Sequence, residues 1–241
     1  MVTLQKLWKY TEHQEYSKEL LQVCDNDKII AQLLANRGIK TSEEAKTFLN
    51  TSQTQLSSPF EFEDLPKILE RIKKAIDKQE AVLIYGDFDV DGVTGTSILL
   101  KTLKHIGANV SYYIPDRVKE SHGLNTTAIC KLISSRQVKL LITTDCGISN
   151  YSEISLAKGF GVDTIITDHH ELPEILPPAY GIMNPKMLLP TSKMYEMSGA
   201  GVSYKLSVAL LEDYGKLDFA NEILYLAAIG TIADLVPLVK E

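Results

Sequence analysis

The sequence predicts an α/β protein with a doubly wound, mainly parallel five-stranded sheet, helices on both faces, and a small helical N-terminal segment. From residue 65 onward, short apolar runs alternate with amphipathic stretches of helical length. The apolar runs are continuous, without a polar residue at every second position, and this pattern is typical of parallel strands buried on both faces. Residues 1–60 lack the alternation, so we expect a helical segment there and a second domain at residues 61–241.

The N-terminal segment is predicted to contain two short helices within residues 25–50. Thr41 or Ser42 would open the second one, because a hydroxyl followed by acidic residues caps a helix N-terminus. Residues 51–66 are polar and contain proline, as expected of a connector. We interpret the segment as a helical cap rather than as a binding module.

The second domain is predicted from the order of its apolar patterns. Strands are expected at residues 81–86, 109–115, 138–145 and 162–168. Helices are expected at residues 65–79, 93–107, 126–137, 151–161, 198–215 and 219–237. Strands separated by helices in this way form right-handed crossovers in a parallel sheet.

The bulk composition restricts the partners and the compartment. The 241 residues carry a net charge of −6, so the overall field does not steer the protein towards nucleic acid, and any such partner must be bound locally. Three widely spaced cysteines form neither a disulfide framework nor a zinc ribbon. No signal-peptide pattern or membrane-spanning apolar run is evident, and a cytoplasmic protein with no membrane partner is expected.

Acidic and imidazole side chains follow three of the predicted strands. Because ligands bind at the carboxyl ends of strands in open parallel sheets, these side chains are expected along one rim. Any one of them could be a helix cap, but three carboxylates within five residues exceed what one helix end needs. The residues are Asp87, Asp89, Asp91, Asp145, Asp168, His169 and His170.

The D-x-D-x-D-G spelling at residues 87–92 also opens a calcium-binding EF-hand loop. That loop requires a bidentate glutamate at position twelve and a preceding helix. Position twelve is Ile98, and a predicted strand precedes the loop, so the EF-hand is excluded. Oxygen ligands with some imidazole favour Mn²⁺ or Mg²⁺, and the histidines favour Mn²⁺. Carboxylates from several strands can hold two ions that activate water and clamp phosphate oxygens.

Other residues are assigned to this rim by their chemistry. Gly92 and Gly95 would let an anion approach the start of the following helix. His169 is expected to be a ligand and His170 to contact a carboxylate or the substrate phosphate, since neighbours on a strand point to opposite faces. His122 is either part of the site or a plain loop residue.

Three further residues have ambiguous patterns. Arg117 is either a cation for a phosphate or a solvated arginine. Cys146 has no partner base and is expected to be a buried thiol. Asp234 is either a cap or a ligand that points inward.

The motifs resemble those of the DHH phosphoesterases, and most closely the RecJ-type single-strand-specific exonucleases. YGDFDVDG, TTDCG, TDHHELP, NPK, SGAG and GTIADLVPL occur in the family's order, and the similarity covers most of the chain from about residue 60. The resemblance implies 5′-to-3′ hydrolysis of single-stranded DNA to 5′-mononucleotides, in DNA repair and recombination, with two Mn²⁺ or Mg²⁺ ions. An alternative within the family is hydrolysis of short oligonucleotides or small nucleotides. A nucleic-acid-binding scaffold without activity would be expected to have lost the acidic residues, and all of them are present.

The resemblance also implies residue roles. The metal ligands would be Asp89, Asp91, Asp145, His169 and Asp234. Asp87 and Asp168 belong to the same motifs, with Asp87 a further candidate ligand. His170 would lie near the scissile phosphate and Arg117 would hold a substrate phosphate, with Gly92 and His122 as further candidates for phosphate contact.

Two departures from the family pattern stand out. Ser121-His122 replaces a Gly-Tyr pair that is usual in RecJ-type proteins. The family's second domain and its oligonucleotide-binding module do not occur within these 241 residues, so we expect the chain to be part of a longer protein. Single-strand-binding and repair proteins would then be bound through the missing regions.

Overall fold

A computed structural model describes residues 9, 12–50, 56–120 and 122–238 of the chain. The chain divides into two compact units, residues 1–56 and 57–241. Residues 51–55 of the predicted connector and Ser121 lie outside the described residues. Over the described ranges, no helix is long and apolar enough to cross a membrane.

The first unit contains the two predicted helices and one more. They are α1 (Lys18–Val23), α2 (Lys28–Asn36) and α3 (Ser42–Leu49). Thr41 caps α3 in a capping box, in which its hydroxyl accepts from the Glu44 N–H and the Glu44 carboxylate accepts from the Thr41 N–H. The extra helix, α1, has six residues and buries only Leu20, which is too short a pattern to predict.

The second unit contains a five-stranded, all-parallel sheet in the order β2-β1-β3-β4-β5, which confirms the predicted fold class. The strands are β1 (Ala81–Gly86), β2 (Val110–Tyr113), β3 (Val138–Thr144), β4 (Asp163–Thr167) and β5 (Gly181–Met183). Strand β5 was not located by the sequence pattern, because three residues carry no periodicity. Strand β5 lies at the edge of the sheet, and the Ile182 N–H donates to the Asp64 carboxylate at 2.9 Å. This hydrogen bond pairs an edge amide that β4 does not reach.

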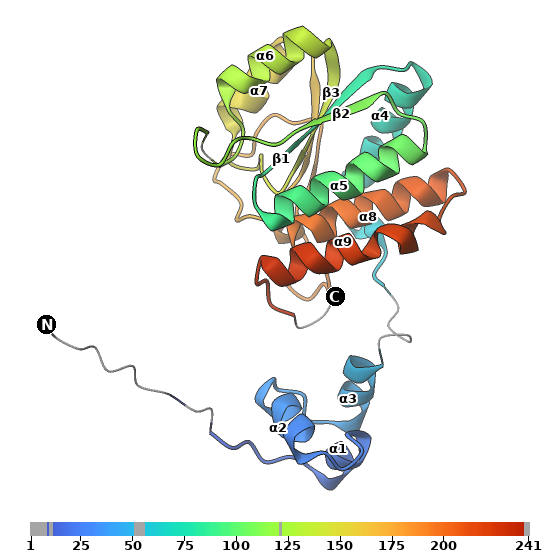
Figure 1. The fold of residues 1–241 in the computed structure, drawn as a ribbon, viewed down its shortest axis with the longest axis vertical. Coiled ribbons are helices and arrows are strands. Elements are labelled where there is room, and N and C mark those ends of the chain that lie inside the picture. Colours follow the sequence, from blue (N-terminus) through green and yellow to red (C-terminus); the bar gives the residue numbers. More distant parts are fainter. Residues whose placement is uncertain (1–8, 10–11, 51–55, 121, 239–241) are drawn as a thin grey trace, which may run out of the picture. The chain divides into compact units, whose positions relative to one another are not determined.

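Helices cover both faces of the sheet, as Figure 1 shows. On one face lie α4 (Leu65–Asp77), α5 (Val90–His105), α8 (Gly199–Asp213) and α9 (Phe219–Ala233). On the other lie α6 (Thr126–Arg136) and α7 (Tyr151–Gly159). Alternate strand residues supply the two cores, with Val82 and Ile84 in the first and Leu83 and Tyr85 in the second.

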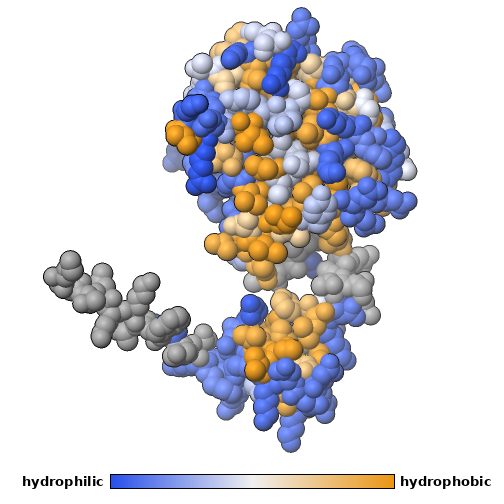
Figure 2. Space-filling view, viewed as in Figure 1, coloured by the Kyte–Doolittle hydropathy of each residue, from blue (hydrophilic) through white to orange (hydrophobic). Residues whose placement is uncertain are grey.

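Helices α5, α8 and α9 approach one another closely at the end of the sheet where β1, β3 and β4 terminate. Gly230 of α9 makes this possible, since an added Cβ would lie 2.5 Å from Thr94 Oγ1 and 2.6 Å from Ala200 Cβ. The outer face of α9 remains apolar and exposed, through Leu224, Tyr225, Ile229 and Ile232 among others, and Figure 2 shows apolar side chains gathered there.

Candidate metal centre

Four predicted ligands from four different elements meet at the carboxyl edge of the sheet. Asp91 lies in the first turn of α5, Asp145 follows β3, His169 follows β4, and Asp234 caps the C-terminus of α9. Asp91, His169 and Asp234 can present ligand atoms within 4.8 Å of one another, and so can Asp145, His169 and His170. The strand ends converge because all the strands run parallel.

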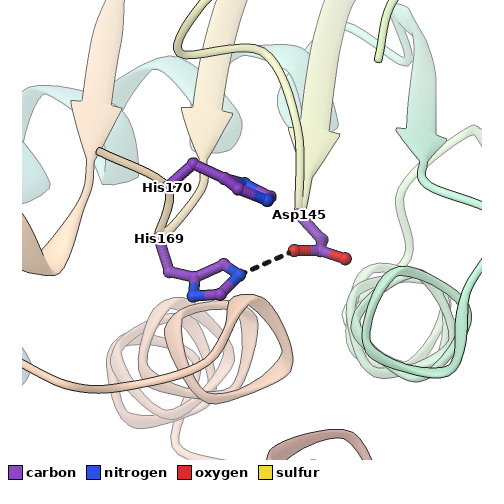
Figure 3. Close-up of side chains that lie close together, drawn as sticks. All are labelled: Asp145, His169 and His170. Carbon is purple, nitrogen blue, oxygen red and sulfur yellow. Dashed lines mark ion pairs between the residues drawn. The ribbon is translucent and has the colours of Figure 1, made fainter. Parts of the chain in front are cut away.

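His169 is the centre of this cluster. Its Nε2 lies 3.1 Å from Asp145 Oδ1, 3.6 Å from Asp234 Oδ2 and 3.8 Å from Asp91 Oδ2. Figure 3 shows the His169 ring directed at the Asp145 carboxylate. Both His169 Nε2 and Asp145 Oδ1 are buried, and neither makes a hydrogen bond within the described part of the chain. Buried polar atoms of this kind normally have a partner, so a cation is a candidate partner for this pair.

Asp91 is fixed by the start of helix α8. Its Oδ2 accepts from the Gly199 N–H at 2.6 Å and its Oδ1 from the Ala200 N–H at 2.9 Å. The carboxylate is therefore held at a helix N-terminus, where the helix dipole stabilises negative charge. This arrangement fixes a buried carboxylate at the cluster, with Asp91 Oδ2 3.8 Å from His169 Nε2.

Asp145 is held in an unfavourable environment for a lone carboxylate. Its φ of 59° lies in the left-handed region, which aspartate tolerates better than most residues. Burial, followed by the charges of Asp91, Asp89 and Asp168, raises the pKa of Asp145 to about 10. The group must therefore carry a proton or face a cation, and a divalent ion would restore the ionised form.

His170 takes a different position from His169. Its Nδ1 is 2.7 Å from Asp168 Oδ1, so it does contact a carboxylate as the sequence predicted. The two rings lie on one side, with centroids 4.6 Å apart, and Figure 3 shows both near Asp145. The alternation expected of a strand does not apply, because β4 ends at Thr167.

Asp168 is a buried anchor for the loop after β4. It accepts from the N–H groups of His169 and Ile148 at 2.7 and 2.9 Å. Burial opposes its ionisation, but the hydrogen bond and charge of the His170 side chain and the backbone N–H groups of Ile148 and His170 lower the pKa of Asp168 overall. In turn, the hydrogen bond to Asp168 raises the pKa of His170.

The other two aspartates of the first motif are partly used in local structure. Asp89 caps α5, because its Oδ1 accepts from the Gly92 N–H at 2.9 Å. Asp87 Oδ1 accepts from the Phe88 N–H at 2.8 Å, and Asp87 Oδ2 lies 2.9 Å from His122 Nδ1. Asp87, Asp89 and Asp145 nevertheless form a third group whose ligand atoms lie within 4.8 Å of one another.

The predicted phosphate contacts have mixed placements. Gly92 is buried against the turn after β1, where an added Cβ would lie 2.5 Å from Asp87 O, and its N–H is taken by Asp89. Gly95 packs against Thr144 of β3. Both glycines thus serve close packing of helix on sheet. Arg117 is exposed, with its Cζ 5.4 Å from the ring centroid of Phe88.

Cys146 is a buried thiol, as predicted. Its Sγ lies 3.7 Å from the Tyr85 carbonyl oxygen, and burial raises the pKa of this thiol. Two residues near the centre were missed by the sequence analysis. Phe88 contacts Arg117 and His122, and Asn184, fully buried, donates to the His170 carbonyl at 2.9 Å. An asparagine directly before a proline inside the NPK motif was the available signal for Asn184.

The residues present fit a divalent metal ion. Carboxylate oxygens predominate, imidazole is the minority ligand, and two buried atoms lack hydrogen bonds within the described residues. The parallel sheet and the cluster at its edge together define an α/β domain built to hold divalent metal.

Comparisons with known proteins identify the family. Residues 81–231 match the family described as DHH family, N-terminal domain, and the chain belongs to the DHH family. The single-stranded-DNA-specific exonuclease RecJ of Bacillus subtilis (strain 168) is 45% identical over 228 residues, which cover 95% of this chain and 28% of that protein. RecJ of Escherichia coli (strain K12) is 30% identical, over 87% of this chain and 37% of that protein. The chain thus spans well under half the length of these curated relatives.

Solved structures agree with the sequence comparison. RecJ from Thermus thermophilus in complex with Mn²⁺ has a TM-score of 0.73 and 29% identity, covering 92% of this chain and 30% of that one. A crystal structure of exonuclease RecJ bound to manganese has a TM-score of 0.67 and 36% identity, covering 73% of this chain and 44% of that one. The resemblance to RecJ-type proteins is therefore confirmed in sequence and in fold.

Proposed function

We propose that the chain is the catalytic part of a metal-dependent phosphodiester hydrolase. Its reaction is 5′-to-3′ exonucleolytic digestion of single-stranded DNA to 5′-mononucleotides, in DNA repair and recombination. The observation that carries this proposal is the buried His169–Asp145 pair, 3.1 Å apart and without hydrogen bonds in the described structure, with Asp91 and Asp234 beside it. The similarity to proteins named single-stranded-DNA-specific exonuclease supports the substrate.

The site would hold two ions, Mn²⁺ or Mg²⁺. One group of ligands contains Asp91, His169 and Asp234, another contains Asp87 and Asp89, and Asp145 can serve both sides. When bound, such a pair supplies Lewis acidity to water and to the phosphate oxygens. Solved structures of RecJ with Mn²⁺ and with Mg²⁺ support either metal.

The chain's own residues would orient the phosphodiester. His170 is half-exposed and has its Nδ1 fixed by Asp168, so its Nε2 is free to face a phosphate oxygen. The hydrogen bond to Asp168 raises the pKa of His170, which favours the protonated ring that a phosphate would attract. Arg117 is exposed, with its Cζ 5.4 Å from the Phe88 ring centroid, and is proposed to hold a second phosphate oxygen.

The proposed exonuclease function also suggests the partners, and the cysteines suggest the compartment. Single-stranded DNA is the proposed macromolecular partner, and single-strand-binding and repair proteins would contact parts of the longer protein. Cys24, Cys130 and Cys146 are all free thiols, which fits a reducing compartment, so we place the protein in the cytoplasm.

The test is metal-dependent release of nucleotides from a 5′-labelled single strand. Asp145→Asn should lower the rate by more than about 100-fold, since even changes around metal ligands cost 10–100-fold. Asp213→Asn is the matched control, because Asp213 is exposed and pairs with Lys73 on a distant helix. Undiminished release by the Asp145 variant would refute the proposal.

Hydrolysis of short oligonucleotides or small nucleotides is the second candidate. It is favoured by the cavity beside the cluster, which has a volume of about 360 Å³ and includes Asp87, Asp145, Asp168 and His170 in its lining. This volume is at the small end of the range for ligand pockets. Rates on a dinucleotide and on a long single strand separate the two candidates, and a strong dinucleotide preference that persists in the full-length protein would favour the second.

A further inference from the structure

His122 is an exposed side chain that is nevertheless held in one orientation. About 72% of the side chain is accessible to solvent. Its Nδ1 lies 2.9 Å from Asp87 Oδ2, and its ring centroid lies 4.2 Å from that of Phe88 with the planes 48° apart. A loop imidazole with no such contacts would sample several rotamers. Two independent contacts therefore present one ring surface to solvent.

That ring surface opens onto the metal centre. His122 lines the cavity of about 360 Å³ whose wall also contains Asp145, Asp168 and His170. A molecule that touches the His122 ring can thus also reach Asp145, one of the proposed metal ligands. The cavity holds a small ligand, so a single nucleotide is the size of group to consider.

Phe88 anchors the loop that carries His122. It lies between Asp87 and Asp89 in the turn that directly follows β1 at the carboxyl edge of the sheet. Arg117, from the start of the loop, places its Cζ 5.4 Å from the Phe88 ring centroid. Arg117 and His122, five residues apart, thus both contact the Phe88 ring.

We propose that His122 is the stacking surface for the 5′-terminal nucleobase of a single-stranded DNA substrate. This rests on the exonuclease function proposed above and identifies its base subsite. Asp87 and Phe88 act as positioning residues that hold the imidazole, and the base stacks on the exposed ring face. Stacking on an aromatic ring accepts any base, because every base has a π-face.

A base can use a surface of His122 that a phosphate contact does not need. The Nδ1 of His122 is directed at the Asp87 carboxylate, so this nitrogen is not available to a phosphate oxygen. A phosphate next to the ring would also meet the negative charge of Asp87 at close range. Stacking uses only the ring face, which neither Asp87 nor Phe88 covers fully, given the exposed fraction of 72%.

Two variants separate the ring from its hydrogen bond. His122→Asn keeps a nitrogen donor towards Asp87 and removes the aromatic face. His122→Phe keeps the aromatic face and removes the donor. Each is assayed for kcat/KM on 5′-phosphorylated single strands that carry either thymine or an abasic residue at the 5′ terminus. We expect the wild type to prefer the thymine strand by about tenfold, His122→Phe to keep this preference, and His122→Asn to lose it.

Because the ratio of kcat/KM on the thymine strand to that on the abasic strand is taken within each variant, any general effect on the metal centre through Asp87 cancels. Equal rates on the two strands for the wild type, or a preference kept by His122→Asn and lost by His122→Phe, would overturn the proposal. Absence of nucleotide release from every strand would instead refute the exonuclease function. In that case a binding experiment decides the base subsite. A single strand with 2-aminopurine at its 5′ terminus is added to each protein after EDTA has removed the metal. Stacking predicts fluorescence quenching by wild type and His122→Phe but not by His122→Asn, and no quenching by wild type contradicts it.

Discussion

Replacing Asp145 by asparagine is expected to stabilise the metal-free protein and to abolish its response to metal. Burial and the charges of Asp91 and Asp89 raise the pKa of Asp145 above neutrality, so the folded protein holds a proton on this carboxyl at pH 7. In the unfolded chain the carboxyl ionises near 3.8. Between the unfolded value of 3.8 and pH 7 lie about three pH units, so keeping the proton lowers the free energy of unfolding by about 4 kcal/mol, at 1.36 kcal/mol per unit.

Asparagine has no such cost. The free energy of unfolding of metal-free Asp145→Asn should exceed that of wild type by up to about 4 kcal/mol at pH 7, or about 10 °C in Tm for a domain of this size. The sign of this stability difference follows because folding raises the pKa of a carboxylic acid. The penalty on the wild type grows as the pH rises above the unfolded value of 3.8 and shrinks as the pH falls towards it. The two proteins should therefore converge in stability near pH 4.

Metal narrows this stability difference. At a free Mn²⁺ concentration of 100 times Kd, binding to one site stabilises the wild type by about 2.7 kcal/mol, and the variant should gain nothing. Calorimetric melting of both proteins in EDTA and in Mn²⁺, at pH 7 and at pH 5, measures the stability difference and the shift caused by Mn²⁺ at each pH. Asp213→Asn should behave as wild type. A metal-free variant less stable than wild type at pH 7, or one that keeps the Mn²⁺ shift, would contradict the assignment of Asp145 as a buried ligand.

Three further outcomes are expected. Gly230→Ala should lower the unfolding free energy in urea by about 1–3 kcal/mol, because its Cβ would meet Thr94 and Ala200, and an unchanged midpoint would show that α9 moves freely. Thr41→Ala should destabilise α3 by about 1 kcal/mol, seen as faster amide exchange in α3 and not in α5. Backbone hydrogen bonds to Thr41 and Lys40 lower the pKa of Glu44, so this stabilisation of α3 is present above the unfolded value of 4.5 and is lost as the pH falls through the folded one. Glu44→Gln should remove that pH dependence of exchange, and its persistence would assign it to another group.

The order of most elements and the position of the candidate ligands at one edge of the sheet could be predicted from the sequence. Continuous apolar runs such as residues 138–144 can be satisfied only by burial on both faces, so they define parallel strands by themselves. Acidic and imidazole residues placed directly after such runs must lie at one edge, because parallel strands end together. Ile98 at the twelfth loop position excluded an EF-hand without any structure. These inferences depend on local pattern and on the symmetry of a parallel sheet.

The contacts that give each ligand its role depend on residues far apart in the chain, and only the tertiary structure decided them. Asp91 is held by the backbone of Gly199 and Ala200, more than a hundred residues away, and no periodicity encodes that meeting. Strand β5 has three residues and acquires its identity only by pairing with β4. Asp234, ambiguous as a helix-end residue, reaches His169 because Gly230 lets α9 pack closely on α5 and α8. Local propensity determines which element forms, whereas the environment of a buried carboxylate is set by whatever the packed helices bring beside it.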